Sequence, residues 1–160
     1  MPDDYEGNRY LAAFSSWVTN LFGQSNERLS GAVAVQASRL EHVMLVGFTH
    51  EPAIVLAERL SALAPRGLTR CFYADSGSAA VEVALKMSFH YWLNRGMGGK
   101  RRFLTLNNSY HGETLGALSV GDVPLYREIY QPLLLPVITV PSPDCYLRAA
   151  GESWADHSRR

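Results

Sequence analysis

The chain has 160 residues, of which 47% are hydrophobic and 19% charged, with 15 basic and 15 acidic side chains. This balance predicts a packed core, and it excludes a broad nucleic-acid or anionic-membrane surface, because such surfaces need an excess of Lys and Arg. The acidic start, MPDDYEGNRY, does not resemble a signal peptide, and no apolar run reaches the roughly 20 residues that span a bilayer. We therefore expect a cytoplasmic protein that binds neither nucleic acid nor membrane.

Helical patterns dominate the first half of the chain. The apolar segment 11–22 is compatible with a strand or a loop. Asn26 is placed to cap a helix over residues 27–40, and Thr49 is placed to cap a second helix over residues 51–63. These helices precede the part of the chain in which strands are expected.

Strand-like segments alternate with helices in the second half. Three short apolar segments are predicted as strands: 70–74, 102–106 and 136–140. A long helix is expected over residues 78–93, a short helix within 107–122, and a Pro/Tyr-rich loop at 123–132. This order predicts an α/β fold with a mainly parallel sheet flanked by helices. Three strands are few for this class, which indicates an incomplete domain.

The turn DSGS at residues 75–78 leads from a predicted strand into the long helix. One interpretation is routine N-capping by a hydroxyl or carboxylate, which the local pattern alone favours. The other is an anion site, in which free helix amides and the hydroxyls of Ser76 or Ser78 bind phosphate, and Gly77 permits close approach.

Each of the other candidate site residues can also be explained by a purely structural role. Tyr110 and His111 follow a predicted strand, where α/β proteins place ligands, but they are also explained as a packing tyrosine and a loop histidine. Trp17 could border a pocket or belong to the core. The two cysteines, Cys71 and Cys145, form no metal motif, and the apolar surroundings of Cys71 indicate a buried side chain.

Four segments together resemble one known family. They read SSWV, EHVMLVGFTHEPAIVLAERL, FYADSGSAAVEVALKMSFHYW and NSYHGETLGALSVGD. They are similar to the adenosylmethionine–8-amino-7-oxononanoate aminotransferases of biotin synthesis, which are class III, pyridoxal-phosphate-dependent enzymes of fold type I. The resemblance covers residues 14–143, which would form the N-terminal part of the large domain. Residues 1–13 diverge and are expected to be frayed, and residues 144–160 form a tail of unclear structure.

The resemblance implies a role for each candidate residue. Gly77 and Ser78 would bind the phosphate of the cofactor, and His111 would contribute to the same site. Tyr110 would stack on the pyridine ring and border the substrate pocket, which Trp17 would line. The family usually has a second tryptophan where this chain has Val18. The implied substrates are S-adenosylmethionine and 8-amino-7-oxononanoate, and the implied assembly is a homodimer.

Departures from the family pattern limit what these residues could do alone. The family's DEI…GFGRTG segment and its Ser-Lys-Gly segment, which carries the Schiff-base lysine, have no counterpart here. The two lysines present, Lys86 and Lys100, do not match that position. The chain therefore looks like a truncated or split N-terminal portion that is inactive by itself. The alternatives are a fragment of another class III omega-aminotransferase and a non-catalytic remnant or assembly module.

Overall fold

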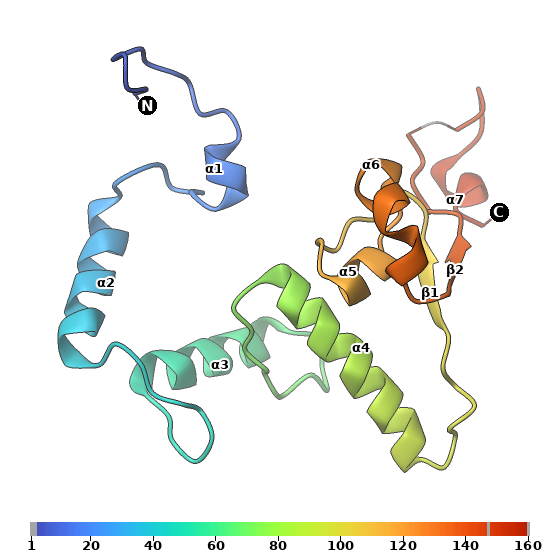
Figure 1. The fold of residues 1–160 in the computed structure, drawn as a ribbon, viewed down its shortest axis with the longest axis horizontal. Coiled ribbons are helices and arrows are strands. Elements are labelled where there is room, and N and C mark those ends of the chain that lie inside the picture. The colour runs from blue at the N-terminus through green and yellow to red at the C-terminus, as the bar shows by residue number, and fades with distance from the viewer. Residues whose placement is uncertain (1–2, 147, 160) are drawn as a thin grey trace. The chain divides into compact units, whose positions relative to one another are not determined.

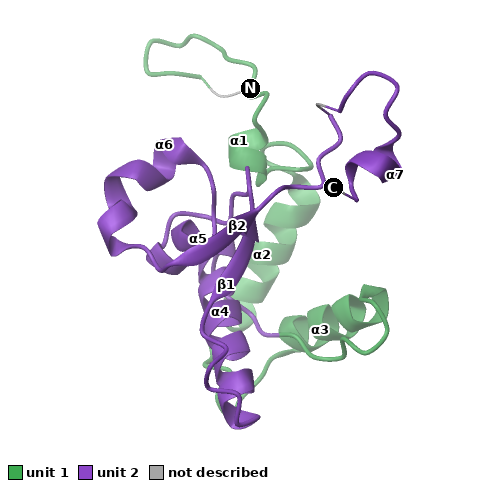
Figure 2. Cartoon of the chain, turned by 90° about the vertical axis from the view of Figure 1, so that its right-hand side faces the viewer, with its two compact units in different colours: residues 1–71 green, residues 72–160 purple. Residues whose placement is uncertain are grey.

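The computed structural model describes residues 3–146 and 148–159. It contains two compact units, residues 1–71 and residues 72–160, coloured separately in Figure 2. The first unit holds α1 (Ser15–Val18), α2 (Glu27–Arg39) and α3 (Glu51–Leu63), labelled in Figure 1. The second holds α4 (Gly77–Asn94), β1 (Phe103–Leu106), α5 (Leu115–Ser119), α6 (Pro124–Arg127), the 3-10 helix η1 (Glu128–Leu133), β2 (Val137–Val140) and α7 (Trp154–His157). No helix in the described ranges is long and apolar enough to cross a bilayer.

The helix starts of the first unit follow from local sequence. The side chain of Asn26 accepts a hydrogen bond from the amide of Leu29 at 3.2 Å, which confirms it as the N-cap of α2. The predicted bounds of α3 are also confirmed. The predicted cap of α3 was wrong, because His50 occupies the N-cap position and no side chain caps the helix there. Pro52 in the first turn has no N–H to satisfy, so this start needs one acceptor fewer.

The segment that was expected to be a strand or a loop contains the single turn α1. All four of its residues have positive φ, including Trp17 at 61° and Val18 at 59°. The left-handed region costs about 1–2 kcal/mol for a residue with a Cβ, and more crowding is expected for a β-branched one. Of the two alternatives left open, the strand is therefore excluded, and Trp17 lies on a strained turn.

The second unit is built on a two-stranded parallel sheet. Its register pairs Phe103 with Val137 and Leu106 with Val140. The strands are joined through α5, α6 and η1, which lie beside the sheet in Figure 1. The short helix between the strands was predicted, but the expected loop at 123–132 is helical instead. Pro124 begins α6, where its fixed φ favours a helix start, a signal that the loop prediction overlooked.

The first predicted strand was also wrong. Residues 70–74 lie outside the sheet, which in the described ranges consists of β1 and β2. A strand needs a partner for its amides and carbonyls, so an apolar β-prone sequence alone does not form one. The sheet therefore has two strands rather than three. Cys71 lies in this segment and is exposed, which corrects the expectation of a buried thiol.

The core is small and centres on α5. Its buried apolar residues are Ala117, Leu118 and Val120. Two buried hydroxyls are satisfied: Ser119 Oγ accepts from the amide of Leu135 at 2.9 Å, and Thr105 Oγ1 donates to the carbonyl of Val120. By contrast, α1, α2, α3 and α4 contain no buried residue. The best-packed part of the chain is thus the connection that follows β1.

Candidate active site

The N-terminus of α4 carries the predicted phosphate-binding turn. The helix begins at Gly77, and the hydroxyl of Ser76 accepts a hydrogen bond from the amide of Ala79 at 3.1 Å. Within the described part of the chain, the amides of Gly77 and Ser78 have no acceptor. A Cβ built on Gly77 would meet nothing within 4 Å, so the approach to these amides is open. Capping and anion binding are therefore compatible, because different groups perform them.

The His111–Gly112 turn lies against the first turn of α4. A Cβ built on Gly112 would lie 1.8 Å from Ser78 Oγ, and φ at Gly112 is +108°. Both facts require glycine, since any side chain would clash and would adopt a strained conformation. The structure thus brings together Ser78 and the turn after Tyr110, which are more than 30 residues apart in the sequence.

The hydroxyl of Tyr110 is hydrogen-bonded, and its ring is partly exposed. Its Oη donates to Glu113 Oε1 at 3.0 Å, and its ring centroid lies 5.6 Å from that of Tyr126. The hydrogen bond to the Glu113 carboxylate raises the pKa of Tyr110 above the ordinary tyrosine value. The side chain is 49% exposed, so the ring retains surface on which a flat ligand could stack.

Glu82 is a site-supporting residue that the sequence interpretation missed. It extends from α4, and its Oε1 accepts from the amides of Gly116 at 2.7 Å and Ala117 at 3.3 Å, at the start of α5. The pKa of Glu82 is lowered, mainly by a hydrogen bond from the Thr114 side chain. The two amides and nearby Lys86 lower it further, whereas partial desolvation raises it. A carboxylate at a helix start is stabilised by the local amides. No local pattern reveals this contact, because its partners lie 34 and 35 residues away.

The same loop is fixed from its other side by Asp122. The amide of Asn108 donates to Asp122 Oδ2 at 3.2 Å, and the amide of Asp122 donates to the carbonyl of Ser109 at 2.7 Å. The guanidinium of Arg127 pairs with Asp122 Oδ1 at 3.1 Å. Together with Glu82, these contacts position the segment that carries Tyr110.

Two further predicted residues are Trp17 and His111. Trp17 belongs to the first unit and is 74% exposed. His111 is exposed and lines a hollow of about 300 Å³ that also contacts Val81 and Leu85 of α4. Lys100 Nζ lies 3.5 Å from the centroid of the Trp92 ring, a cation–π contact. The described residues contain no group of three or more metal-ligating side chains.

Comparison with known proteins identifies the family. A model described as "Aminotransferase class-III" matches residues 1–160. The chain belongs to the class III aminotransferase family. The adenosylmethionine-8-amino-7-oxononanoate aminotransferases of Helicobacter pylori and Geobacter sulfurreducens are 51% and 46% identical to it, over 88% and 89% of this chain. Each match covers 32% of the relative, so the chain spans about a third of the length of these curated relatives.

Solved structures of class III enzymes match the fold. The Methanocaldococcus jannaschii adenosylmethionine-8-amino-7-oxononanoate aminotransferase has a TM-score of 0.82 at 39% identity, covering 88% of this chain and 32% of that one. The omega transaminase of Pseudomonas jessenii in complex with PMP has a TM-score of 0.84 at 30% identity, covering 98% of this chain and 36% of that one. The predicted partial α/β fold of the pyridoxal-phosphate-dependent class is confirmed, and it does not by itself distinguish the two substrate classes.

Proposed function

We propose that this chain forms the phosphate-binding and ring-stacking part of a pyridoxal-phosphate-dependent aminotransferase. The proposed reaction transfers an amino group from S-adenosylmethionine to 8-amino-7-oxononanoate and gives 7,8-diaminononanoate. The observation that carries the proposal is the contact between Ser78 and Gly112, because it places the open amides of α4 beside the turn that carries Tyr110.

The residues present fit the phosphate of this cofactor. The amides of Gly77 and Ser78, with the dipole of an 18-residue helix behind them, are suited to an anion. The Ser78 hydroxyl can add a hydrogen bond, and the open space at Gly77 allows the phosphate to reach the backbone. When bound, the cofactor supplies an electron sink and a carrier for the amino group.

Tyr110 and His111 are proposed to orient the ring of the cofactor. The hydrogen bond from Tyr110 to Glu113 fixes the hydroxyl end of the tyrosine, so that the ring face is presented in one orientation. His111 follows directly and can hydrogen-bond a polar group of the ligand. Glu82 acts indirectly, since it holds the start of α5 and thereby the turn before it.

Sequence identity supports the adenosylmethionine-type substrate. Curated relatives with that name are 39–51% identical to this chain, whereas the omega transaminase structures are about 30% identical. We propose that Trp17 lines the substrate pocket, which Tyr110 borders, and that the enzyme acts in the cytoplasm as a homodimer. Neither Lys86 nor Lys100 is proposed to anchor the cofactor, so these 160 residues are not expected to transaminate alone.

A chimera tests the proposal. In the Helicobacter pylori relative, the 141 matched residues would be replaced by the corresponding residues of this chain. The purified chimera should form 7,8-diaminononanoate from S-adenosylmethionine, and Tyr110→Ala and Trp17→Ala should each lower its kcat/KM. A folded chimera that instead accepts simple omega-amines would favour the omega-aminotransferase alternative. A folded chimera that transfers no amino group would favour the non-catalytic one.

A further inference from the structure

Two neighbours contact different parts of the Tyr110 side chain. Its Oη donates to Glu113 Oε1 at 3.0 Å. The ring of Tyr126 lies beside the Tyr110 ring, with 5.6 Å between the centroids and 53° between the planes. This separation is within the range of favourable aromatic pairs. Tyr126 belongs to α6, beyond α5 in the sequence, so the ring contact is tertiary rather than local.

The two contacts restrict different motions of the Tyr110 ring. A tyrosine ring turns about the axis through its Cγ and Cζ atoms, and this torsion has a broad, roughly two-fold distribution. The hydroxyl oxygen lies on that axis, so the hydrogen bond to Glu113 fixes the hydroxyl end of the ring more than the tilt of its plane. A neighbour beside the ring restricts the tilt, because turning the ring would bring it into that neighbour. Among the described residues, Tyr126 is the aromatic side chain in this position.

The backbone of α6 holds Tyr126 in place. The helix begins at Pro124. The carbonyl of Val123 accepts hydrogen bonds from the amides of Tyr126 at 3.1 Å and Arg127 at 3.2 Å. The Tyr126 side chain is half-buried. A partly buried side chain on a hydrogen-bonded turn has lost rotamer freedom, so Tyr126 gives the Tyr110 ring a fixed neighbour.

The residue after Tyr126 connects α6 to the segment that carries Tyr110. Arg127 Nη1 lies 3.1 Å from Asp122 Oδ1, and Asp122 Oδ2 accepts from the amide of Asn108 at 3.2 Å. The side chains of Arg127 and Asp122 are 17% and 29% exposed, so solvent screens this ion pair less than it screens a surface pair. α6 therefore contacts the Tyr110 segment twice, through the ring of Tyr126 and through the ion pair of Arg127.

We propose that Tyr126 is a positioning residue for the cofactor ring. It acts through Tyr110, since it restricts the tilt of the Tyr110 ring and so favours one orientation for stacking on a flat aromatic ligand. Tyr110 is 49% exposed, so the contact with Tyr126 leaves ring surface for that ligand. The inference deepens the proposed function and rests on it. Tyr126 is expected to contribute to the affinity for the ring of the ligand but not for its phosphate, which is proposed to bind at Gly77 and Ser78.

Two ligands, pyridoxamine phosphate and inorganic phosphate, separate these contributions. Pyridoxamine phosphate carries the ring and the phosphate but no aldehyde that would react with Lys86 or Lys100. Both dissociation constants are measured from the amide chemical shifts of Gly77 and Ser78 in the ¹⁵N-labelled chain. Tyr126→Ala should raise the dissociation constant of pyridoxamine phosphate about threefold or more and leave that of inorganic phosphate unchanged. Tyr126→Phe keeps the aromatic ring and should restore the parent value.

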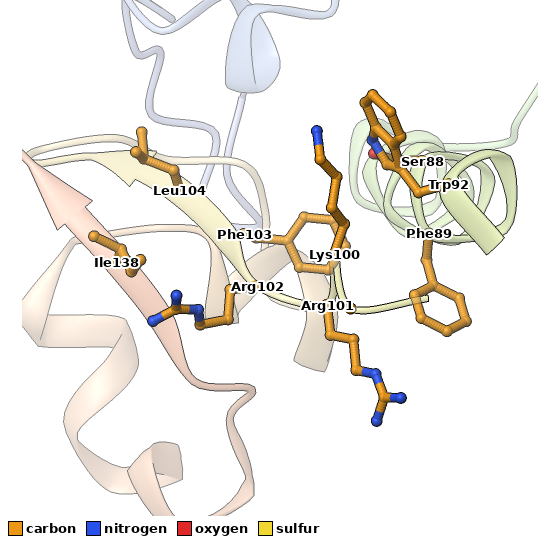
Figure 3. A pocket seen from close by; sticks show the side chains of 10 residues that line it. Ser88, Phe89, Trp92, Lys100, Arg101, Arg102, Phe103, Leu104 and Ile138 are labelled. Atoms are coloured by element: carbon orange, nitrogen blue, oxygen red, sulfur yellow. The ribbon is translucent and has the colours of Figure 1, made fainter. Parts of the chain in front are cut away.

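Trp92 provides a matched control. It is half-buried like Tyr126, and its ring also forms an aromatic pair, with Tyr91, at 5.1 Å between centroids. It lies beside Lys100 near the end of α4 (Figure 3), about 22 Å along the helix from Gly77. Trp92→Leu should therefore change neither dissociation constant. Far-UV circular dichroism verifies that each variant folds as the parent does, and Tyr126→Leu replaces Tyr126→Ala if the alanine variant does not fold.

The ring-proton chemical shifts of Tyr110 give a second readout without any ligand. They should change in Tyr126→Ala and stay at the parent values in Trp92→Leu, because only the first variant removes a ring beside Tyr110. Three results overturn the inference: unchanged Tyr110 ring shifts in Tyr126→Ala, an unchanged affinity of that variant for pyridoxamine phosphate, or equal losses of affinity for both ligands. A parent chain that binds neither ligand, or both with equal affinity, would contradict the proposed function itself and this inference with it.

Discussion

Two parts of the second unit differ sharply in how they are stabilised. The connection from β1 through α5 and Val120 contains the buried side chains of the described residues, and its buried hydroxyls are hydrogen-bonded. The 18-residue helix α4 is longer and is rich in apolar residues, yet it contains no buried residue. It follows that contacts within the chain stabilise the turn that bears Tyr110, whereas the apolar side chains of α4 remain partly exposed.

The largest difference in the free energy of unfolding is expected between substitutions of a core leucine and of an apolar residue of α4. Leu118→Ala should lower the free energy of unfolding by about 3 kcal/mol, because Leu118 is 4% exposed and its removal leaves a cavity. Met87→Ala should change it by less than about 1 kcal/mol, because Met87 is half exposed. Urea unfolding followed by circular dichroism measures both. Equal losses would show that α4 is packed as well as α5 is.

Gly112→Ala should have the next largest effect. The new Cβ would clash with Ser78 Oγ at a backbone with φ of +108°, so we expect a loss of about 2 kcal/mol in the same urea experiment. Gly99→Ala is the control, because its Cβ would meet nothing within 4 Å and its backbone is not left-handed; it should change stability by less than about 0.5 kcal/mol. If both variants behave alike, the turn does not lie against α4.

Glu82→Gln should cost about 1 kcal/mol at neutral pH. It weakens the charge-assisted bonds to the amides of Gly116 and Ala117, and partial exposure screens the effect. The pKa of Glu82 is lowered in the folded chain, so its contribution is complete above the ordinary glutamate pKa of about 4.3 and is lost as the pH falls through the lower folded value.

Stability curves measured between pH 7 and 3 check this assignment. The difference between the parent and Glu82→Gln should shrink as the solution becomes acidic. Glu128→Gln, at an exposed position of η1, is the control and should change the free energy of unfolding at neutral pH by less than about 0.5 kcal/mol. A difference for Glu82→Gln that does not depend on pH would show that its charge does not stabilise the start of α5.

The smallest effect concerns ionisation rather than stability. The hydrogen bond to Glu113 raises the pKa of Tyr110 above the ordinary tyrosine value. Subtracting the ultraviolet titration of Tyr110→Phe from that of the parent isolates Tyr110, and this difference curve should show the raised pKa. In the background of Glu113→Gln, the same difference should move to lower pH. Identical curves in the two backgrounds would contradict the hydrogen bond that orients Tyr110.

Residues close to a helix end predicted those helix starts and ends that depend only on neighbouring residues. The cap at Asn26, the bounds of α3 and the long helix after Ser76 follow from residues within one turn of each end. The resemblance then selected Gly77, Ser78 and Tyr110 as cofactor residues, roles that remain proposals. The structure adds that Ser78 and the turn after Tyr110 lie together.

Features that depend on distant partners could not be read from the sequence. Residues 70–74 have strand composition, but they lie outside the sheet, which in the described ranges consists of β1 and β2. Glu82 looks like an ordinary helix residue until α5 is placed beside it. The loop expected at 123–132 was an error of a different kind, since Pro124 is a local helix-start signal that the prediction overlooked.

Binding of the phosphate of pyridoxal phosphate by the free amides at the start of α4 is the basis of the proposed function. It is tested most directly by amide chemical shifts of the ¹⁵N-labelled chain, titrated to millimolar ligand so that weak binding is detected. Pyridoxal phosphate should shift the amides of Gly77 and Ser78, pyridoxal without phosphate should not, and the amide of Gly99 should respond to neither. Equal shifts with both ligands, or no shift at Gly77 and Ser78 with pyridoxal phosphate, would contradict the account.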